Sequence, residues 1–167
     1  MLKYSDTLIE HFQNPRNVGT IEDADGVGKL SSDVCGDIMH LFIKVEDGRI
    51  ADVKFTTFGC AAAVASGSML TEMIKGLTIQ EAVKITKEDI ADNLDGVPEP
   101  KMHCSLLAAD CLRLAVEDYY RKEVKMKCDF CGVDIPVEEC MFARKKVIDG
   151  KEHFFCCDRC LEKAEQK

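Results

Sequence analysis

The sequence predicts an α+β fold, in which a small antiparallel sheet of about three strands is covered by helices and followed by a small cysteine-rich domain. Apolar and polar residues alternate over residues 39–45 and again over 51–57, which is the period of β-strands. Between these runs, Asp47-Gly48 is a turn signal that joins them into a hairpin. The patterning then becomes helical, and strands followed by helices are typical of an α+β layer.

The predicted strands have one apolar face each and are preceded by a helix. Ser5 can cap a first helix through Phe12, which ends at Asn14-Pro15. A third strand around residues 26–32 completes the sheet. The residues expected on one face of the hairpin are Met39, Leu41, Ile43 and Val45 in the first run and Ala51, Val53, Phe55 and Thr57 in the second.

The helical part begins with a helix over residues 61–75 that Gly76 stops. Thr78 opens a short helix, a further turn follows Thr86, and residues 96–100 form a loop. The last helix is expected from Ser105 to about Arg121. Its predicted buried stripe consists of Leu106, Leu107, Leu112, Leu114 and Val116.

Composition restricts the class of protein. The 167 residues are 46% hydrophobic, which suffices for one core, or for one core and a small satellite. A net charge of −8 and a pI near 5.0 argue against a nucleic-acid groove or an anionic membrane as partner. No apolar run approaches the roughly 20 residues of a membrane span. The charged start of the chain, with Lys3, Asp6 and Glu10, does not resemble a signal peptide, so a cytoplasmic protein is expected.

Ten cysteines are the main feature of the composition, and they fall into two groups. With no export signal and with Gly, Asp and His as neighbours, thiolates bound to metal in a reducing compartment are a better interpretation than disulfides. Four are widely spaced in the first 122 residues, and six crowd the last 40 or so. A charged stretch at 121–125 separates them, so we expect one domain over 1–122 and a small metal-stapled domain over 125–167.

Three of the early cysteines are predicted to lie at element boundaries. Cys35 precedes a strand, whereas Cys60 and Cys104 each open a helix, where backbone N–H groups and the helix dipole should lower a thiol's pKa. Soft thiolates select iron–sulfur clusters, zinc or Cu(I). Ligands from three separate loops favour an open, labile site over a tight structural one. Taken singly, each cysteine could be a buried hydrophobe, as Cys111 is expected to be.

Several motifs occur in the order and spacing of a known family. They are Tyr4-Ser5-Asp6 through Asn14-Pro15-Arg16-Asn17-Val18-Gly19, Cys35-Gly36-Asp37, Thr57-Phe58-Gly59-Cys60-Ala61 and Lys101-Met102-His103-Cys104-Ser105. Over about residues 1–122 the chain resembles the IscU/NifU-type iron–sulfur cluster assembly scaffolds. The resemblance implies a scaffold without turnover of its own, acting as a monomer or homodimer. It would take sulfur from an IscS/NifS-like cysteine desulfurase and iron from a donor, and pass a labile [2Fe–2S] cluster to apo-proteins.

The resemblance also implies roles for individual residues. Cys35, Cys60 and Cys104 match the cluster ligands and sulfur acceptors, which can hold zinc in the absence of iron. The other matching positions are Asp37, whose carboxylate tunes cluster lability, Lys101, which offsets negative charge, and His103, a fourth ligand or near neighbour. The loop before Lys101 reads Val97-Pro98-Glu99-Pro100 instead of the Leu-Pro-Pro-Val that the family's chaperone recognises, so a chaperone partner is left open.

The C-terminal segment carries a second thiol site. Cys128 and Cys131 form a tight C-x-x-C pair, and Asp149-Gly150 is a hairpin turn between residues 142–148 and 152–155, which lead to the later cysteines. About 40 residues cannot build a self-sufficient core, so metal must supply folding free energy. The segment resembles the TRASH/YHS-like treble-clef zinc modules, which implies Cys128, Cys131, Cys156 and Cys160 as ligands. A C-x-x-C alternative uses Cys157 instead of Cys156, and Cys140 is unassigned.

Two other functions are compatible with these residues. A zinc- or metal-responsive regulator or metal store would use the tail as the sensor, and metal analysis distinguishes it from a scaffold. A thiol enzyme such as a sulfurtransferase would use Cys104 with His103 as base. Adjacent residues rarely share the hydrogen-bond geometry that such activation needs, and persulfide acceptance would explain the same reactivity.

Overall fold

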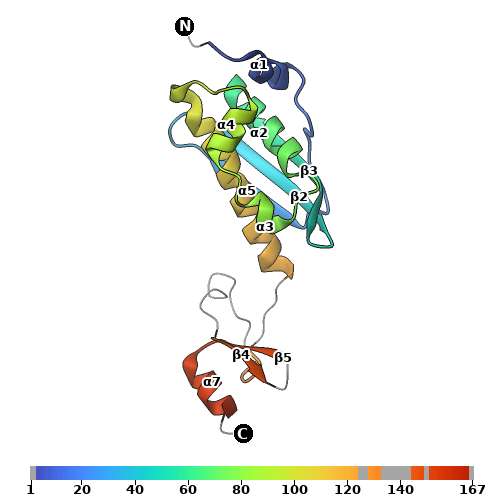
Figure 1. Cartoon of the computed structure of the whole chain (residues 1–167), viewed down its shortest axis with the longest axis vertical. Coiled ribbons are helices and arrows are strands. Elements are labelled where there is room, and N and C mark those ends of the chain that lie inside the picture. Colours follow the sequence, from blue (N-terminus) through green and yellow to red (C-terminus); the bar gives the residue numbers. More distant parts are fainter. Residues whose placement is uncertain (1–2, 124–127, 133–143, 149–150, 166–167) are drawn as a thin grey trace. The chain divides into compact units, whose positions relative to one another are not determined.

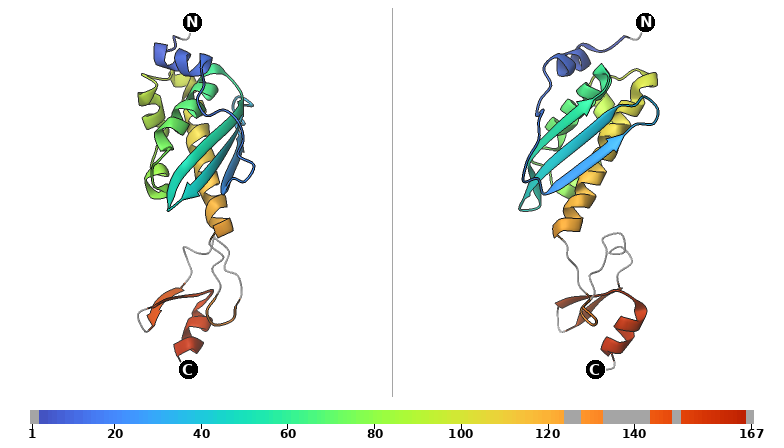
Figure 2. Two further views of the ribbon diagram at one scale, coloured as in Figure 1. Left: turned by 90° about the vertical axis from the view of Figure 1, so that its right-hand side faces the viewer. Right: turned by 180° about the vertical axis from the view of Figure 1, so that it is seen from behind.

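The computed structural model describes residues 3–123, 128–132, 144–148 and 151–165 (Figure 1). The chain forms two compact units, Met1–Tyr119 and Tyr120–Lys167. The first holds a three-stranded antiparallel sheet in the order β1-β2-β3, from β1 (Gly26–Ser31), β2 (Ile38–Glu46) and β3 (Arg49–Phe58). The helices of this unit cover one face of the sheet, as Figure 2 shows, so the predicted α+β fold is confirmed.

The β2–β3 hairpin has the predicted turn and one irregularity that the alternation did not indicate. Asp47 and Gly48 both have positive φ, 51° and 74°, as a two-residue type I′ turn requires. Val45 pairs with Ile50 but Lys44 pairs with Asp52, which leaves Ala51 as an extra residue in β3. Ala51 is therefore exposed and Ile50 is buried in its place, so the prediction that Ala51 lies on the core face is wrong.

The helices begin close to the predicted positions. They are α1 (Asp6–Gln13), α2 (Ala61–Ile74), α3 (Ile79–Ala82), α4 (Lys87–Asn93), the 3-10 turn η1 (Glu99–Lys101) and α5 (Met102–Glu123). The hydroxyls of Ser5, Thr78 and Thr86 accept a backbone N–H at the starts of α1, α3 and α4. Helix α2 differs, because its N-cap residue Cys60 makes no side-chain capping bond and no acidic residue lies in its first turn.

Helix α5 begins three residues earlier than predicted and buries a partly different stripe. Leu107, Leu112 and Val116 are buried as expected and Leu114 is half-buried, but Leu106 is 40% exposed, so its prediction is wrong. Small residues also lie on the buried face, among them Ala108, Cys111 and Ala115. They are small because β1 crosses the helix closely, and a Cβ on Gly28 would lie 2.0 Å from the Cys111 carbonyl oxygen. Cys111 is thus a packing residue, as predicted.

This close crossing gives a prediction for stability. Gly28→Ala should lower the free energy of unfolding by about 1–3 kcal/mol, the usual range for overpacking, because the added methyl meets backbone rather than a movable side chain. Urea unfolding followed by circular dichroism measures the change. Ser31→Ala, an exposed position of the same strand, is the matched control and should stay within about 0.5 kcal/mol of wild type. Equal stability of the two variants would contradict the packing argument.

The N-terminal segment is held on α2 by buried polar contacts. The His11 imidazole, 4% exposed, places Nδ1 2.8 Å from Ser68 Oγ, which also accepts the backbone N–H of Arg16. Asn17 donates to Thr71 Oγ1 at 3.0 Å. Burial lowers the pKa of His11 below its ordinary 6.5, and the charge of Arg16 acts in the same direction, whereas Glu72 opposes it. The neutral imidazole is therefore the form that fits this contact.

The stability of the first unit should consequently depend on His11 below neutral pH. Because the folded-state pKa is lowered, the contribution is complete above pH 6.5 and is lost as the pH falls from there to the lowered value. Through this one group the free energy of unfolding can change by at most about 1.4 kcal/mol per pH unit. Between pH 5 and 7.5 the free energy of unfolding should depend less on pH in the His11→Asn variant than in wild type. The asparagine side chain keeps a hydrogen-bond partner for Ser68. His40→Asn in β2 is the matched control, and an unchanged slope in His11→Asn would contradict this prediction.

The second unit contains a hairpin of β4 (Arg144–Ile148) and β5 (Lys151–Phe155) followed by α7 (Asp158–Glu165). Its buried residues in the described part are Cys128, Phe155 and Cys160, with Cys156, Leu161 and Ala164 packed against them. The predicted turn Asp149-Gly150 and Cys140 lie outside the described residues. So small a core is consistent with stabilisation by metal. Among the described helices, none is long and apolar enough to cross a membrane.

Candidate metal centres

The first thiol site lies where the strands and helices of the first unit begin and end. Ile38 pairs with Phe58, so the start of β2 and the end of β3 meet at one end of the sheet. Cys35 and Asp37 lie just before β2, and Cys60 follows β3 as the N-cap of α2. Cys104 lies in the first turn of α5. Sheet pairing and two helix starts therefore gather residues from three distant parts of the sequence.

The ligand atoms form two overlapping groups. The Sγ atoms of Cys60 and Cys104 are 3.5 Å apart, and Cys104 Sγ lies 3.6 Å from Asp37 Oδ2. The ligand atoms of Asp37, Cys60 and Cys104 lie within 4.8 Å of one another, as do those of Cys35, Asp37 and His103. Asp37 belongs to both groups. The two groups therefore adjoin each other through Asp37 and together contain five of the residues predicted for this site.

Burial differs strongly among the three thiols. Cys104 is fully buried, Cys60 half-buried and Cys35 exposed, so the site opens on the side of Cys35. Burial raises the pKa of the Cys104 thiol far above its ordinary value, and the neighbouring Cys60 and Asp37 raise it further. The expectation of a lowered pKa at this helix start is therefore wrong for Cys104, because desolvation and like charge outweigh the helix dipole. A bound cation would supply the charge that favours the thiolate.

Lys101 and His103 supply the polar groups beside the thiols. The pKa of Lys101 is raised mainly by the negative charge of Cys60, with smaller contributions from Cys104, Tyr4 and Asp37. The lysine therefore lies close enough to offset the charge of the site. His103 Nε2 is buried and has no hydrogen-bond partner in the described part of the chain. An orphaned buried imidazole nitrogen calls for a partner, and a metal ion is one that fits.

Gly59 is required by the geometry of the site. A Cβ at this position would lie 2.7 Å from Asp37 Cγ, closer than real contacts allow. The missing side chain is what lets the end of β3 pass beside the carboxylate. Gly36, with φ of 72°, supplies the left-handed turn between Cys35 and Asp37. Gly36 and Gly59 are the glycines that stand next to Cys35 and Cys60 in the motifs quoted above.

An apolar rim, defined as Val34, Ile38 and Phe58, borders the site. Phe58 is 80% exposed and Val34 78% exposed, which is unusual for large apolar side chains. Each is within two residues of a predicted ligand, and Ile38 and Phe58 lie opposite each other across β2 and β3. We did not predict this rim. The sequence feature that could have indicated the rim is an apolar residue beside each ligand motif. Strand alternation alone does not explain these residues.

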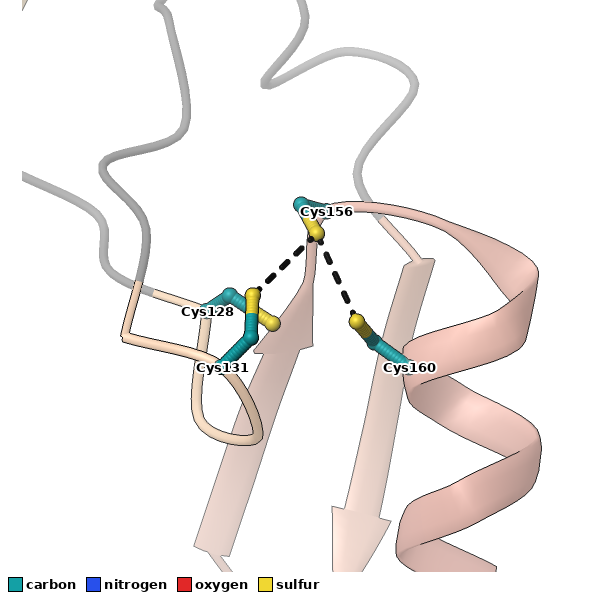
Figure 3. Close-up of side chains that lie close together, drawn as sticks. All are labelled: Cys128, Cys131, Cys156 and Cys160. Atoms are coloured by element: carbon teal, nitrogen blue, oxygen red, sulfur yellow. Dashed lines mark hydrogen bonds between the residues drawn. The ribbon is translucent and has the colours of Figure 1, made fainter.

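The second site is a compact set of four thiols in the C-terminal unit (Figure 3). The Sγ atoms of Cys128, Cys131, Cys156 and Cys160 lie within 4.8 Å of one another. Cys156 Sγ is 3.7 Å from Cys131 Sγ and 3.6 Å from Cys160 Sγ. Tetrahedral zinc with Zn–S bonds of about 2.3 Å requires sulfur atoms about 3.8 Å apart, so this donor set fits zinc. Cys157 is exposed and lies outside the set, 3.9 Å from Cys156.

The electrostatics of this set also suit a cation. Burial raises the pKa of Cys128, but backbone N–H groups of Cys131, Cys156 and Phe130 lower it more, to about 6. Burial raises the pKa of Cys160 to about 12, and the thiols of Cys160 and Cys131 raise that of Cys156. Four thiols so close cannot all ionise without a positive charge between them.

An open site of thiols, a carboxylate and an imidazole on an α+β domain defines a protein that handles a soft metal or a metal–sulfur cluster. The chain belongs to the family of the NifU-like N terminal domain, whose family model matches residues 3–126. It is 63% identical over 123 residues to two iron–sulfur cluster assembly scaffold proteins of Archaeoglobus fulgidus, IscU 1 and IscU 2, covering 74% of this chain and 80% of theirs. The IscU of Aquifex aeolicus is 46% identical over 127 residues, covering 75% of this chain and 81% of that one.

Solved structures agree on the fold. A scaffold protein for the SUF system from Fervidobacterium islandicum superposes with a TM-score of 0.59 at 28% identity, covering 68% of this chain and 96% of that one. The N-terminal part of a NifU-like protein from Brucella abortus gives 0.61 at 19% identity, covering 71% and 94%. These findings confirm the family suggested by the motifs of the first unit. The family match ends before Cys128, so it does not identify the C-terminal unit.

Proposed function

We propose that this chain is an iron–sulfur cluster assembly scaffold that receives sulfur from a cysteine desulfurase and iron from a donor, and passes a labile [2Fe–2S] cluster to apo-proteins. The single observation that carries the proposal is the convergence of Cys35, Cys60 and Cys104 with Asp37 and His103 at one open end of the sheet. The relatives at 63% identity bear the name of such scaffolds. The family consists of scaffolds, not enzymes, and the cluster is cargo of this protein.

The roles of the residues follow from their chemistry. Cys35, Cys60 and Cys104 supply the soft thiolates that clusters require, and exposed Cys35 is the first thiol that a partner's sulfur can reach. Asp37, central to both ligand groups, offers a hard oxygen that competes at a soft site and so eases release of the cargo. His103 is a candidate fourth ligand, and Lys101 offsets the negative charge of the loaded site.

The apolar rim suits docking of a protein partner. Val34 and Phe58 are exposed beside the thiols, and covering them would remove water from the site while sulfur is transferred. A desulfurase or an apo-protein could use this surface in turn. The thiols must stay reduced between encounters, which is consistent with action in a reducing compartment such as the cytoplasm.

For the C-terminal unit we propose a zinc site formed by Cys128, Cys131, Cys156 and Cys160, in a TRASH/YHS-like treble clef. The spacing of the sulfur atoms supports this set over the one that uses Cys157, which lies outside it. Zinc would supply a positive charge among thiols of unequal pKa and would stabilise a unit with a small core.

The test is an anaerobic incubation of the chain with ferrous iron, L-cysteine, a catalytic amount of a cysteine desulfurase, and dithiothreitol as the reductant that converts persulfide sulfur to sulfide. We expect a red-brown [2Fe–2S] chromophore, with about two irons and two sulfides per cluster, that disappears when an apo-ferredoxin is added and reappears on the ferredoxin. A metal-responsive regulator or store would instead retain only zinc at both sites under the same conditions, and that result would overturn the scaffold proposal.

A further inference from the structure

Five thiols, rather than four, lie together among the described residues of the C-terminal unit. Beyond the four-cysteine set, Cys157 places its Sγ 3.9 Å from Cys156 Sγ. This distance is close to those that join Cys156 to Cys131 and Cys160, 3.7 and 3.6 Å. A fifth sulfur atom is therefore within ligand-exchange distance of one particular member of the set.

The spare thiol lies on the accessible side of the site. Cys128 and Cys160 are buried, whereas Cys131 and Cys157 are exposed and Cys156 is half-buried. A ligand that leaves the metal on the Cys156 side can therefore be solvated, and a replacement can enter there. On the buried side, at Cys128 and Cys160, a leaving ligand cannot be solvated and a replacement cannot enter.

Local structure holds Cys157 in place beside the set. It immediately precedes α7, and its carbonyl oxygen accepts the backbone N–H groups of Cys160 and Leu161 at 3.1 and 3.2 Å. The first turn of the helix thus carries both a ligand of the set and the spare thiol, so their separation is fixed.

We propose that Cys157 is an alternate ligand that exchanges with Cys156, so that the C-terminal site releases its divalent metal to thiol-bearing acceptors instead of holding it permanently. The inference rests on the proposed zinc site. In the exchange, the Cys157 sulfur binds the metal as the Cys156 sulfur leaves, and the proton given up by Cys157 passes to Cys156. The metal is held by four thiolates before and after the exchange and by three during it, and no electron is transferred. During the exchange, an external thiol can compete for the vacated position.

The first test asks whether Cys157 can replace Cys156 as a ligand. It uses the full chain carrying Cys35→Ser, Cys60→Ser and Cys104→Ser, so that only the C-terminal site binds metal. Zinc per chain is measured after gel filtration. Cys156→Ser should retain one zinc, because Cys157 takes the place of the missing ligand. Cys131→Ser, the matched control that also removes a ligand, should lose the zinc. The double variant Cys156→Ser/Cys157→Ser should lose it too.

The identity of the ligands is checked with Co²⁺ in place of zinc, since thiolate-to-cobalt charge-transfer absorbance rises with the number of bound thiolates. Cys156→Ser should keep the intensity of the parent. In the kinetic arm, Cys157→Ser should bind zinc as the parent does but transfer it to a coloured chelator about tenfold more slowly, as a raised exchange barrier requires. Serine is chosen because it preserves a residue suited to the start of α7.

The outcomes separate the two proposals. If Cys156→Ser loses zinc as fully as Cys131→Ser, or if Cys157→Ser transfers zinc at the parent rate, the exchange is refuted while the zinc site stands. If the parent with serines in the first site binds no zinc at all, the zinc site itself is refuted, and the exchange with it.

Discussion

Replacing Cys104 by alanine should abolish cluster assembly. Its sulfur lies 3.5 Å from that of Cys60 and 3.6 Å from the Asp37 carboxylate, so its loss removes the deepest thiol from the group that contains both. The remaining half-buried Cys60 and exposed Cys35 cannot enclose a cluster. In the desulfurase-driven assay we expect the visible absorbance of the cluster to fall by more than about tenfold, because the group that would hold the cluster has lost its most deeply buried ligand.

Cys111→Ala is the control that separates chemistry from packing. Cys111 is also fully buried in α5, but its thiol contacts the Met39 carbonyl oxygen instead of the site. Both variants remove one buried sulfur and should lose similar amounts of stability, about 1–3 kcal/mol. We expect Cys111→Ala to assemble the cluster normally. Assembly that survives in Cys104→Ala, or that is lost equally in both variants, would show that Cys104 is not a ligand.

Removing metal from the C-terminal unit should unfold it while leaving the first unit intact. The described part of this unit buries only Cys128, Phe155 and Cys160, two of which are proposed ligands. Structural zinc contributes about 10–16 kcal/mol in small domains, more than such a core can replace. Treatment with a strong chelator should therefore collapse the amide chemical shifts of β4, β5 and α7 to those of an unfolded chain.

The signals of β1–β3 serve as the internal control, because none of the four C-terminal cysteines lies in these strands. Limited proteolysis gives an independent measure: after chelation, cleavage should appear within residues 128–165, and zinc should suppress it. Protection that persists after all metal has been removed would mean that the unit folds without metal, and would remove the physical reason for a structural zinc site.

The local structure of the first unit could largely be predicted from its sequence. Strand alternation, the Asp47-Gly48 turn and the hydroxyl caps Ser5, Thr78 and Thr86 each determine structure over a few residues, and all were found. The errors have a different origin. Ala51 moved off the core face because of a bulge set by pairing with β2, and Leu106 is exposed because the buried face of α5 is decided by tertiary packing rather than by apolar spacing alone.

The same distinction applies to the first metal site. The motifs identified its ligands, but the sharing of Asp37 between two ligand groups depends on how the loop before β2 meets the starts of α2 and α5. The raised pKa of Cys104 could not be inferred either, because a helix start alone suggests the opposite direction, and the depth of burial is a property of the whole fold. The exposure of Phe58 is likewise decided by tertiary packing.

The uncapped start of α2 has a consequence for local dynamics. Where α1, α3 and α4 use a hydroxyl to bind their first N–H groups, α2 presents Cys60, so the start of this helix lacks about 1 kcal/mol of capping free energy. Sulfur atoms of a bound cluster can accept hydrogen bonds from these N–H groups. Hydrogen–deuterium exchange at Ala61 and Ala62 should therefore slow when the cargo is loaded and quicken when it leaves, while exchange at the start of α1 stays constant. The beginning of one helix would thus report whether the scaffold is carrying its cluster.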